Sequence, residues 1–394
     1  MRYVSSGVRL LVLTALVCLT STPLRAQSLF NAAGLGFPSE SIDGRGRALG
    51  NLGIGLLGHS ILPSDPGAAG LLVIPTALLV AQPSWVDYQR GADETGSFQG
   101  NRFPLVAIGY PLEGGMFTAS FGSFLDQRFD GQRDVTVDLL DGPSDATDFF
   151  RQDGAVSRVG FGYSRRITEA FGLGVTVGRY AGSVTRQLIR DFGVAALTED
   201  LTLFEAGGRW TYTGTSLTGG FAADLGTFAR LAGSMTWSGA LDATGSEETL
   251  GSDRSFDLPL QYRLGTTVVL APGLLVTASV LRADWADIAD DFTTPATVGS
   301  TNGFGVGIEL SRARMLGLAA PLRFGYRSTG LPFSFGSSVA TETALAGGFG
   351  FVLNETNGFV LAGADFSIER GERSDGVLTE KFWRATLSLR VSGY

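Results

Sequence analysis

Apolar and polar residues alternate one by one along most of the chain after about residue 77. In 255–268 the apolar positions are Phe256, Leu258, Leu260, Tyr262, Leu264 and Val268. The same alternation returns in 228–238, 303–310, 360–368 and 383–391. Because successive side chains of a strand point to opposite faces, this period of two predicts strands that each have one apolar face.

The connections between these segments are of two lengths. Short ones lie at 111–115, 271–273 and 354–358, and long polar ones at 89–100, 127–153, 242–254, 288–299 and 370–378. Short and long connections mostly alternate, which is typical of a transmembrane barrel with tight turns at one end and long loops at the other. Segment 200–224 could be one strand or two, and the even strand number of such barrels favours one.

The pattern therefore predicts an all-β fold, a transmembrane antiparallel β-barrel of about 14 strands over residues 76–394. We expect strands near 76–89, 101–110, 113–127, 154–167, 171–190, 200–224, 227–241, 255–270, 273–287, 300–312, 318–330, 340–353, 357–369 and 379–393. Closure of the sheet removes the two unpaired edges that an open sheet would leave in hydrocarbon. A barrel of this width cannot be filled by its own side chains, so its lumen must hold water or a plug.

Residues 1–26 have the features of a secretory signal peptide. Arg2 and Arg9 precede an apolar run from Leu10 to Thr20, and Ala26 offers a small residue for cleavage. After residue 26 no run of 18 apolar residues appears, so we expect no transmembrane helix.

Residues 27–75 do not alternate and are rich in Gly and small side chains. A segment of this length is too long for a mere linker. In front of a wide barrel it suggests a hatch folded into the lumen, where Gly permits close packing of backbones. The alternative is a disordered periplasmic tail.

Two stretches of this segment carry a resemblance. The stretch Gly46–Gly55, followed by Asp65–Gly70, resembles the amino terminus of the FadL-type family of long-chain fatty acid and hydrocarbon transport porins. In that family an Arg/Gly-rich opening leads to an Asn-Pro-Ala turn and then to a fourteen-stranded barrel with an internal hatch. Asp65 stands where the family usually has Asn, and Gly67 where it has Ala. The resemblance implies a hatch turn formed by Arg47, Asn51, Asp65 and Pro66.

The long segment 127–153 combines seven Asp and three Arg with several apolar side chains. Apolar residues on an exposed loop are costly unless they pack or bind something. By the resemblance, such a loop forms a greasy capture site, and packing on the barrel rim is an equally open interpretation. The expected substrate path combines residues of the hatch with residues of this loop: Phe30, Leu35, Phe37, Leu139, Leu140, Phe149 and Phe150. Six aromatic residues are expected in the belts at the membrane interface: Trp85, Tyr88, Trp210, Trp237, Trp285 and Trp383.

Few residues are available for catalysis or metal binding. His59 is the only His, and Cys18, the only Cys, lies in the expected signal peptide. We therefore expect no enzyme activity, no metal site and no cofactor; in the acidic 127–153 loop a solvated loop is favoured over a calcium site. The formal net charge of −8 and the absence of a basic patch argue against nucleic-acid binding.

The expected function is passive uptake of hydrophobic small molecules, such as long-chain fatty acids or hydrocarbons, across the bacterial outer membrane. The expected partners are outer-membrane lipid, those small molecules and, during biogenesis, the barrel-assembly machinery. Two alternatives stay open: a barrel that serves as a secretion or assembly partner, and a general porin without a hydrophobic substrate. If the 27–45 segment gates the path, deletion of residues 28–40 should alter uptake while the barrel still folds.

Overall fold

The computed structural model describes residues 28–58, 61–91, 94–139, 142–192, 204–247, 249, 253–292, 297–315, 318–356 and 359–393. The expected signal peptide, His59 and Leu140 lie outside these ranges, so the signal peptide stays a prediction. Among the described residues, no helix is long and apolar enough to cross a membrane.

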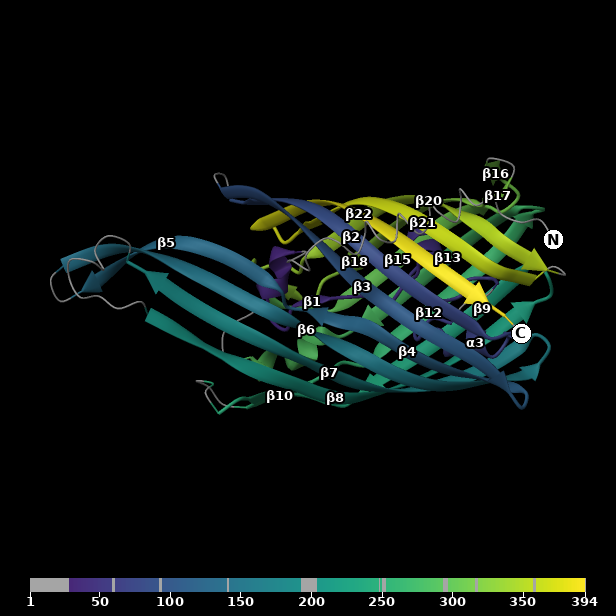
Figure 1. Ribbon diagram of the computed structural model, residues 1–394, viewed down its shortest axis with the longest axis horizontal. Helices are drawn as coiled ribbons and strands as arrows, with labels where there is room; N and C mark the ends of the chain where they lie inside the picture. Colours follow the sequence, from purple (N-terminus) through teal and green to yellow (C-terminus); the bar gives the residue numbers. More distant parts are fainter. Residues whose placement is uncertain are drawn as a thin grey trace.

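Fourteen antiparallel strands of the described chain close into a barrel (Figure 1). In chain order they are β2 (Thr76–Arg90), β3 (Glu94–Leu112), β4 (Gly115–Asp126), β6 (Gly142–Thr168), β7 (Phe171–Asp191), β8 (Phe204–Leu225), β9 (Ala229–Ser238), β12 (Gln261–Ala271), β13 (Leu274–Ala283), β15 (Thr301–Leu310), β18 (Leu322–Gly330), β20 (Thr341–Thr356), β21 (Phe359–Ser374) and β22 (Leu378–Ser392). Each pairs with the next, and β22 pairs with β2, for example Ser388 with Val80, so the sheet closes. The fourteen-stranded barrel is confirmed, and the segment near 200–224 forms one strand, β8.

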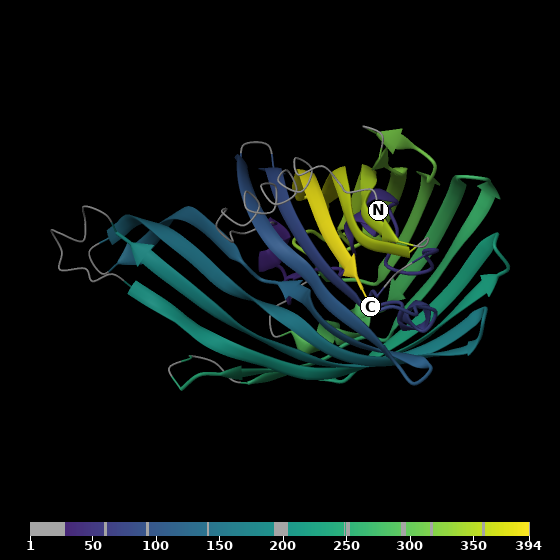
Figure 2. The same cartoon turned by 45° about the vertical axis from the view of Figure 1, so that its right-hand side comes forward.

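The expectation of a long polar loop at 127–153 is wrong. Strand β5 (Phe129–Leu139) forms a hairpin with the first part of β6, and β7 and the first part of β8 extend beside them, so that four strands project beyond the barrel (Figures 1 and 2). The apolar residues of this segment explain the pairing, because Val135 lies opposite Ala146 and Phe150 opposite Leu188. We call residues 129–152 and 186–191 the arm. The expected 89–100 connection likewise belongs largely to β3.

The two ends of the barrel differ. At one end, which we call the turn end, tight turns join β3 to β4, β6 to β7, β8 to β9 and β12 to β13. The small hairpin of β16 (Arg314–Met315) and β17 (Leu318–Ala319) lies between β15 and β18 at this end. The other end, the loop end, carries the arm, β10 (Ala240–Gly245) with β11 (Arg254–Asp257), the 3-10 helix η2 (Trp285–Asp291), and β14 (Thr297–Val298) with β19 (Phe333–Ser334).

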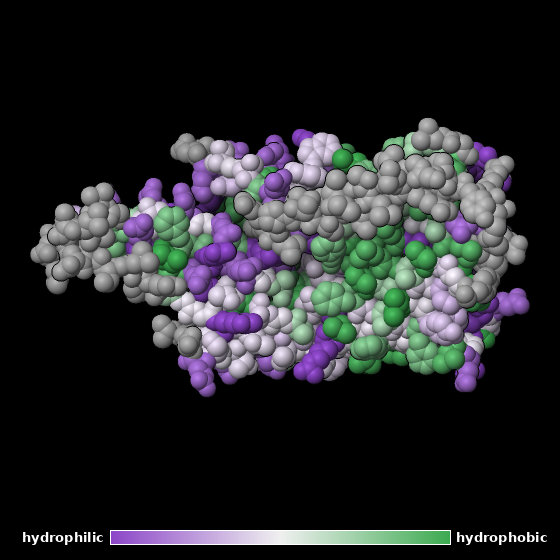
Figure 3. Space-filling model, viewed as in Figure 1, coloured by the Kyte–Doolittle hydropathy of each residue, from purple (hydrophilic) through white to green (hydrophobic). Residues whose placement is uncertain are grey.

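Hydrophobic side chains gather on the outer face of the barrel toward the turn end, whereas hydrophilic side chains are more frequent toward the loop end (Figure 3). Ile108, Phe161 and Leu345 each expose more than half of their side-chain surface on this outer face. The inner face carries buried Ser, Thr, Glu and Arg side chains. This arrangement inverts that of a soluble protein and is the one expected of a barrel wall in lipid.

Trp85, Trp237 and Trp383 are exposed, as residues of an aromatic belt must be, and their place at the membrane interface stays a prediction. The aromatic-belt expectation is wrong for Trp210 and Trp285. Trp285 is buried in η2, and Trp210 packs inward against the core that surrounds Tyr180. Both residues lie at the loop end. There the long strands and the folded loops surround inward-facing aromatic side chains, which pack against protein rather than lipid.

Residues 28–58 and 61–75 lie in the lumen, from the loop end to the turn end. They contain the 3-10 helix η1 (Leu29–Ala32), β1 (Phe37–Pro38), α2 (Gly44–Ala48) and α3 (Pro66–Ala69). α2 packs against β18, β20, β21 and β22, and α3 packs against β6, β7, β8 and β9. The backbone at Gly50 passes so close to β15 that a Cβ atom on Gly305 would lie 1.8 Å from its carbonyl oxygen, so only glycine fits there. The segment is a hatch, as expected.

Candidate functional site

The four expected hatch-turn residues belong to two separate turns: Arg47 and Asn51 lie in and just after α2, and Asp65 and Pro66 begin α3. Asn51 accepts backbone hydrogen bonds from Gly53 and Ile54 through its Oδ1 atom. Asp65 caps α3 by accepting from the Ala68 N–H, and its other oxygen accepts from the Gly55 N–H. Pro66 occupies the first helical position, where its missing N–H is not needed.

Asp65 and Arg47 are both buried. Burial raises the pKa of Asp65 to about 6, although the two backbone N–H groups and nearby Arg230 act to lower it. Arg47 lies 3.4 Å from the Glu40 carboxylate and also donates to the Glu40 carbonyl. These residues therefore fix the path of the hatch.

One side of the lumen binds the hatch through buried charges. Arg45 of α2 forms an ion pair with Glu309 of β15 at 2.9 Å, and Glu309 also pairs with Arg323 of β18 at 2.7 Å. Arg323 in turn pairs with Asp365 of β21. All of these groups are largely withdrawn from solvent, so each charge needs its partner.

A second buried network lies nearer the loop end. The Glu342 carboxylate contacts three guanidinium groups, those of Arg327, Arg373 and Arg384. Glu369 pairs with Arg327 and Arg384, and Glu380 pairs with Arg373 and accepts from the hydroxyl of Ser28. We call this side of the lumen, formed by β15, β18, β20, β21 and β22, the charged wall.

Beyond β2, which follows the charged wall around the barrel, the wall is interrupted between β3 and β4. Pairing between β3 and β4 ends at Leu105 and Gly122. The next residue of β3 is Pro104, which has no N–H to donate to a neighbouring strand. On β4 the register with β6 shifts between Ser123 and Leu125. We call this place, between residues 103–104 and 123–124, the parting.

The hatch occupies the edge of β4 that β3 leaves free. In β1, Phe37 pairs with Asp126 and Pro38 with Leu125. The Ser39 N–H then donates to the Phe124 carbonyl at 2.8 Å.

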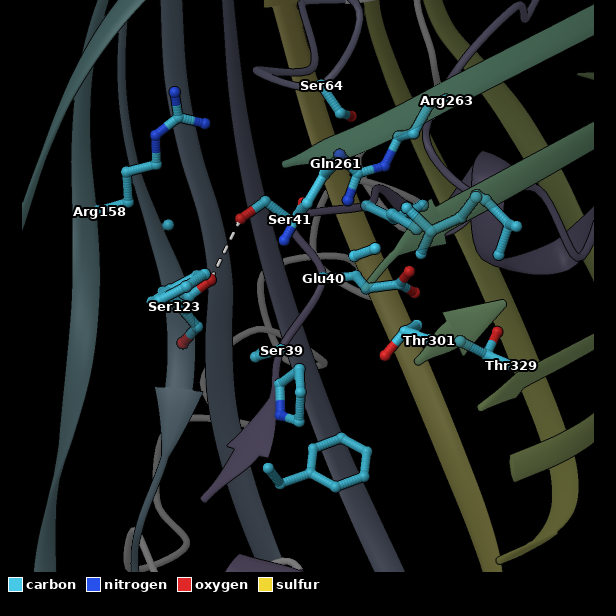
Figure 4. A pocket seen from close by; sticks show the side chains of 18 of the residues that line it. Ser39, Glu40, Ser41, Ser64, Ser123, Arg158, Gln261, Arg263, Thr301 and Thr329 are labelled. Carbon is cyan, nitrogen blue, oxygen red and sulfur yellow. Dashed lines mark hydrogen bonds between the residues drawn. The ribbon is translucent and has the colours of Figure 1, made fainter. Parts of the chain in front are cut away.

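Ser41 closes the remainder of the parting. Its hydroxyl lies 3.0 Å from the Pro104 carbonyl oxygen and 3.5 Å from that of Ser123 (Figure 4). A single hatch side chain therefore bridges the two strands at the point where they separate, and it does so through neutral hydrogen bonds.

A cavity of about 140 Å³ lies beside the parting (Figure 4). Apolar side chains such as Ile42, Leu52 and Leu281 form part of its lining. Two guanidinium groups, those of Arg158 and Arg263, also line it, together with the Glu40 carboxylate, which attracts Arg263 without forming an ion pair within 4.0 Å. Arg158 donates to Thr218, and the Nε atoms of both side chains have no hydrogen-bond partner. Such a pair of cations can bind a carboxylate.

A groove of about 410 Å³ lies at the base of the arm. Its apolar lining consists of Ala32, Phe129, Phe150, Leu188 and Trp210, with Gln152 and Arg186 among the polar residues. Phe150 thus lines a groove, as a residue of the expected substrate path must. The adjacent Phe149 points to the other face of β6, because successive side chains of a strand alternate. Leu139 ends β5. Its side chain and the whole of Leu140 lie outside the part of the chain that the structure describes.

The three apolar hatch residues are all buried. Phe37 lines the cavity. Leu35 packs in the core that contains Tyr180 and Trp285, and Phe30 packs with Phe37, Leu331 and Leu378. Sequence reasoning missed Pro104, Arg158, Arg263 and Trp210. A proline inside an expected strand was the available signal for the parting, whereas nothing local marks which lumenal arginines lack partners.

No group of three or more His, Cys, Asp or Glu in the described ranges could hold a metal ion. The arrangement instead offers an apolar groove at the loop end, a small cavity with two cations, and a wall interruption that the hatch closes.

Neither a protein-family model nor a curated protein matches the sequence. Solved structures do match its fold. A Pseudomonas aeruginosa FadL homologue is 13% identical with a TM-score of 0.62, covering 91% of this chain and 100% of that one. The P. putida toluene transporter TodX is 15% identical with a TM-score of 0.59, and the Ralstonia pickettii toluene transporter TbuX is 17% identical with a TM-score of 0.57; each comparison covers 90% of this chain and 99% of the other.

Proposed function

From its FadL-type transporter fold, we propose that this chain is an outer-membrane channel for the passive uptake of hydrophobic small molecules. The observation that carries the proposal is the parting, where hatch residues 37–41 rather than a neighbouring wall strand complete the edge of β4. Withdrawal of this segment would open the wall sideways, so that an apolar molecule could leave the lumen into lipid without crossing water.

The proposed route begins at the loop end. The groove beside Phe150 and Trp210 collects apolar molecules there, since burial of apolar surface is favourable by roughly 25 cal/mol per Å². From the groove the substrate passes to the cavity beside the parting. In the proposed orientation the loop end faces outside and the turn end faces the periplasm, as in other single-chain barrels.

The cavity favours amphipathic substrates with an acidic end over neutral hydrocarbons. Arg158 and Arg263 place two cations, which form no ion pair within the described chain, beside apolar side chains. A long-chain fatty acid matches both features, because its carboxylate can accept from the guanidinium groups while its chain contacts the apolar lining.

The test compares two substrates that differ only at the head group. Proteoliposomes containing the mature chain are supplied with a long-chain fatty acid, the fatty alcohol of the same length, or a disaccharide. We expect uptake of the acid and slower uptake of the alcohol, with no uptake of the sugar. In the double variant Arg158→Gln/Arg263→Gln, half-saturation for the acid should shift by roughly tenfold while that for the alcohol stays the same.

The result that overturns transport is equal flux of all probes with and without the protein. Rapid flux of the disaccharide would favour the general porin instead. The matched pair Phe150→Ala and Phe149→Ala serves as a control for the entry groove, since only Phe150 lines it. Deletion of residues 28–40 removes the closure of the parting and should raise flux of the fatty acid in a barrel that still folds.

A further inference from the structure

A second apolar groove lies on the outside of the barrel, on the turn-end side of the parting. It runs over β6, β7, β8, β9 and β12 and has a volume of about 720 Å³. Its walls are the outward-facing side chains of Tyr163, Leu173, Val175, Phe221, Met235, Tyr262 and Leu264. The proposed uptake route does not use this surface.

One glycine opens the groove. Gly219 occupies an outward-facing position of β8, where the neighbouring positions carry large side chains such as Leu217 and Met235. A Cβ atom on Gly219 would have no atom within 4 Å, so the space above it is open. At Gly233 of β9 the space is filled, since a Cβ atom there would lie 2.6 Å from the Phe221 ring and 3.0 Å from Leu264.

A cation stands at one end of this groove. Arg165 lines it, is exposed, and makes no ion pair with any described residue. It lies opposite Gly115 of β4 and Leu173 of β7, close to the tight turns at 113–114 and 169–170. An outward-facing arginine at this depth lies where the apolar face gives way to the turn end, which is the level of lipid head groups.

We propose that this groove is a specific binding site for one glycerophospholipid of the periplasmic leaflet, with an acyl chain above Gly219 and the phosphate on Arg165. The assignment rests on the proposed orientation in the outer membrane. Charge complementarity selects the occupant, because the groove offers a long apolar floor with the exposed Arg165 at one end. Arg263 also belongs to the lining, but it alternates with the outward-facing Tyr262 and Leu264, and its side chain lines the cavity in the lumen. A phospholipid has the same two parts in the same order, and a guanidinium binds phosphate through paired hydrogen bonds.

The test measures retained lipid directly. The mature chain is purified in detergent, incubated with palmitoyl-oleoyl phosphatidylethanolamine, and analysed by native mass spectrometry. We expect one phospholipid retained by the wild type. The variant Gly219→Leu fills open space without a clash and should lose the bound lipid. Arg165→Gln should weaken retention by roughly tenfold.

A matched control separates the groove from the general lipid shell. Gly347 faces outward on β20, on another part of the wall, and a Cβ atom there would have its nearest neighbour at 3.8 Å. Gly347→Leu should retain the lipid as the wild type does. The heat-dependent shift of the folded barrel on an electrophoresis gel shows that each variant has folded.

The proposal is overturned if Gly219→Leu retains the lipid unchanged, if the wild type retains none, or if the wild type forms a dimer that Gly219→Leu dissociates. The first and third results would leave transport untouched, because the uptake assay uses the lumen and the parting. Failure of uptake with intact lipid retention would in turn overturn the transport proposal alone.

Discussion

The two sides of the lumen hold the hatch by different physical means. On the charged wall, Arg45 and Ser28 join networks of buried carboxylates and guanidinium groups that extend over β15 to β22. At the parting, by contrast, the hatch is held by backbone pairing, by the Ser41 hydroxyl and by the Phe37 ring, which lies 5.6 Å from the Arg102 guanidinium and 4.6 Å from that of Arg373. None of these contacts is an ion pair between the hatch and the wall. Breaking a buried ion pair leaves an uncompensated charge, whereas a neutral hydrogen bond contributes only about 1 kcal/mol.

From this difference we infer that residues 37–41, rather than α2, move when the hatch opens. In the proposed opening, residues 37–41 leave the parting while α2 stays on the charged wall. The wall then separates beside Pro104, which has no N–H to donate to β4, whereas the buried ion pair between Arg102 of β3 and Asp126 of β4 holds the two strands together next to it.

The largest effect is expected on the charged wall, from Glu342→Gln. The substitution removes the carboxylate charge that Arg327, Arg373 and Arg384 share, and it should lower the free energy of unfolding by about 4 kcal/mol. The measurement is urea unfolding of the barrel in detergent micelles. Asp130→Asn is the control, because its pair with Arg151 in the arm is exposed and should be worth little. Equal effects of the two substitutions would remove the distinction between the charged wall and an ordinary surface.

The next effect concerns the turn end of the hatch and depends on pH. Because the pKa of Asp65 is raised from 3.8 to about 6, its stabilising contribution is complete at low pH and is lost as pH rises through 6. Asp65→Asn should therefore raise the free energy of unfolding at pH 8 by roughly 3 kcal/mol and change it little at pH 4.

Asp375, in the turn between β21 and β22, provides a control of opposite sign. Burial acts to raise its pKa, but hydrogen bonds from the backbone N–H groups of Leu378, Gly336, Val377 and Phe335 outweigh burial and lower it. Asp375→Asn should therefore destabilise the barrel at neutral pH, with the difference shrinking on acidification. Parallel pH profiles for both variants would contradict these assignments.

The smallest effect is expected at the parting itself. Ser41→Ala removes the bridge between the Pro104 and Ser123 carbonyls, and should cost about 1 kcal/mol locally. Amide hydrogen exchange of residues 37–42 should become roughly fivefold faster. Ser388→Ala is the matched control, since Ser388 accepts from the Gly44 N–H on the charged wall. It should leave exchange at 37–42 unchanged, and if it accelerates that exchange equally, the hatch moves as one unit.

The sequence alone predicts the wall well and the site poorly. Alternation such as that of Phe304, Val306 and Ile308 gives the strands, their count and their outward face, because it is a local consequence of the two-residue strand period. The same reasoning failed for 127–153, where charged residues concealed a paired hairpin. Which arginine meets which carboxylate depends on barrel closure and register, which bring Arg373 and Glu342 together from different strands. That information is not present in any local pattern.

The most direct test of the account joins the hatch to the wall with a removable bond. A Cβ atom on Gly122 would lie 3.3 Å from that of Ser41, close to the separation of a disulfide, and the only native cysteine lies in the expected signal peptide. The double variant Ser41→Cys/Gly122→Cys should therefore form a disulfide across the parting when oxidised. We predict that fatty-acid uptake stops in the oxidised protein and returns on reduction, whereas the same rate in both states would contradict opening at the parting.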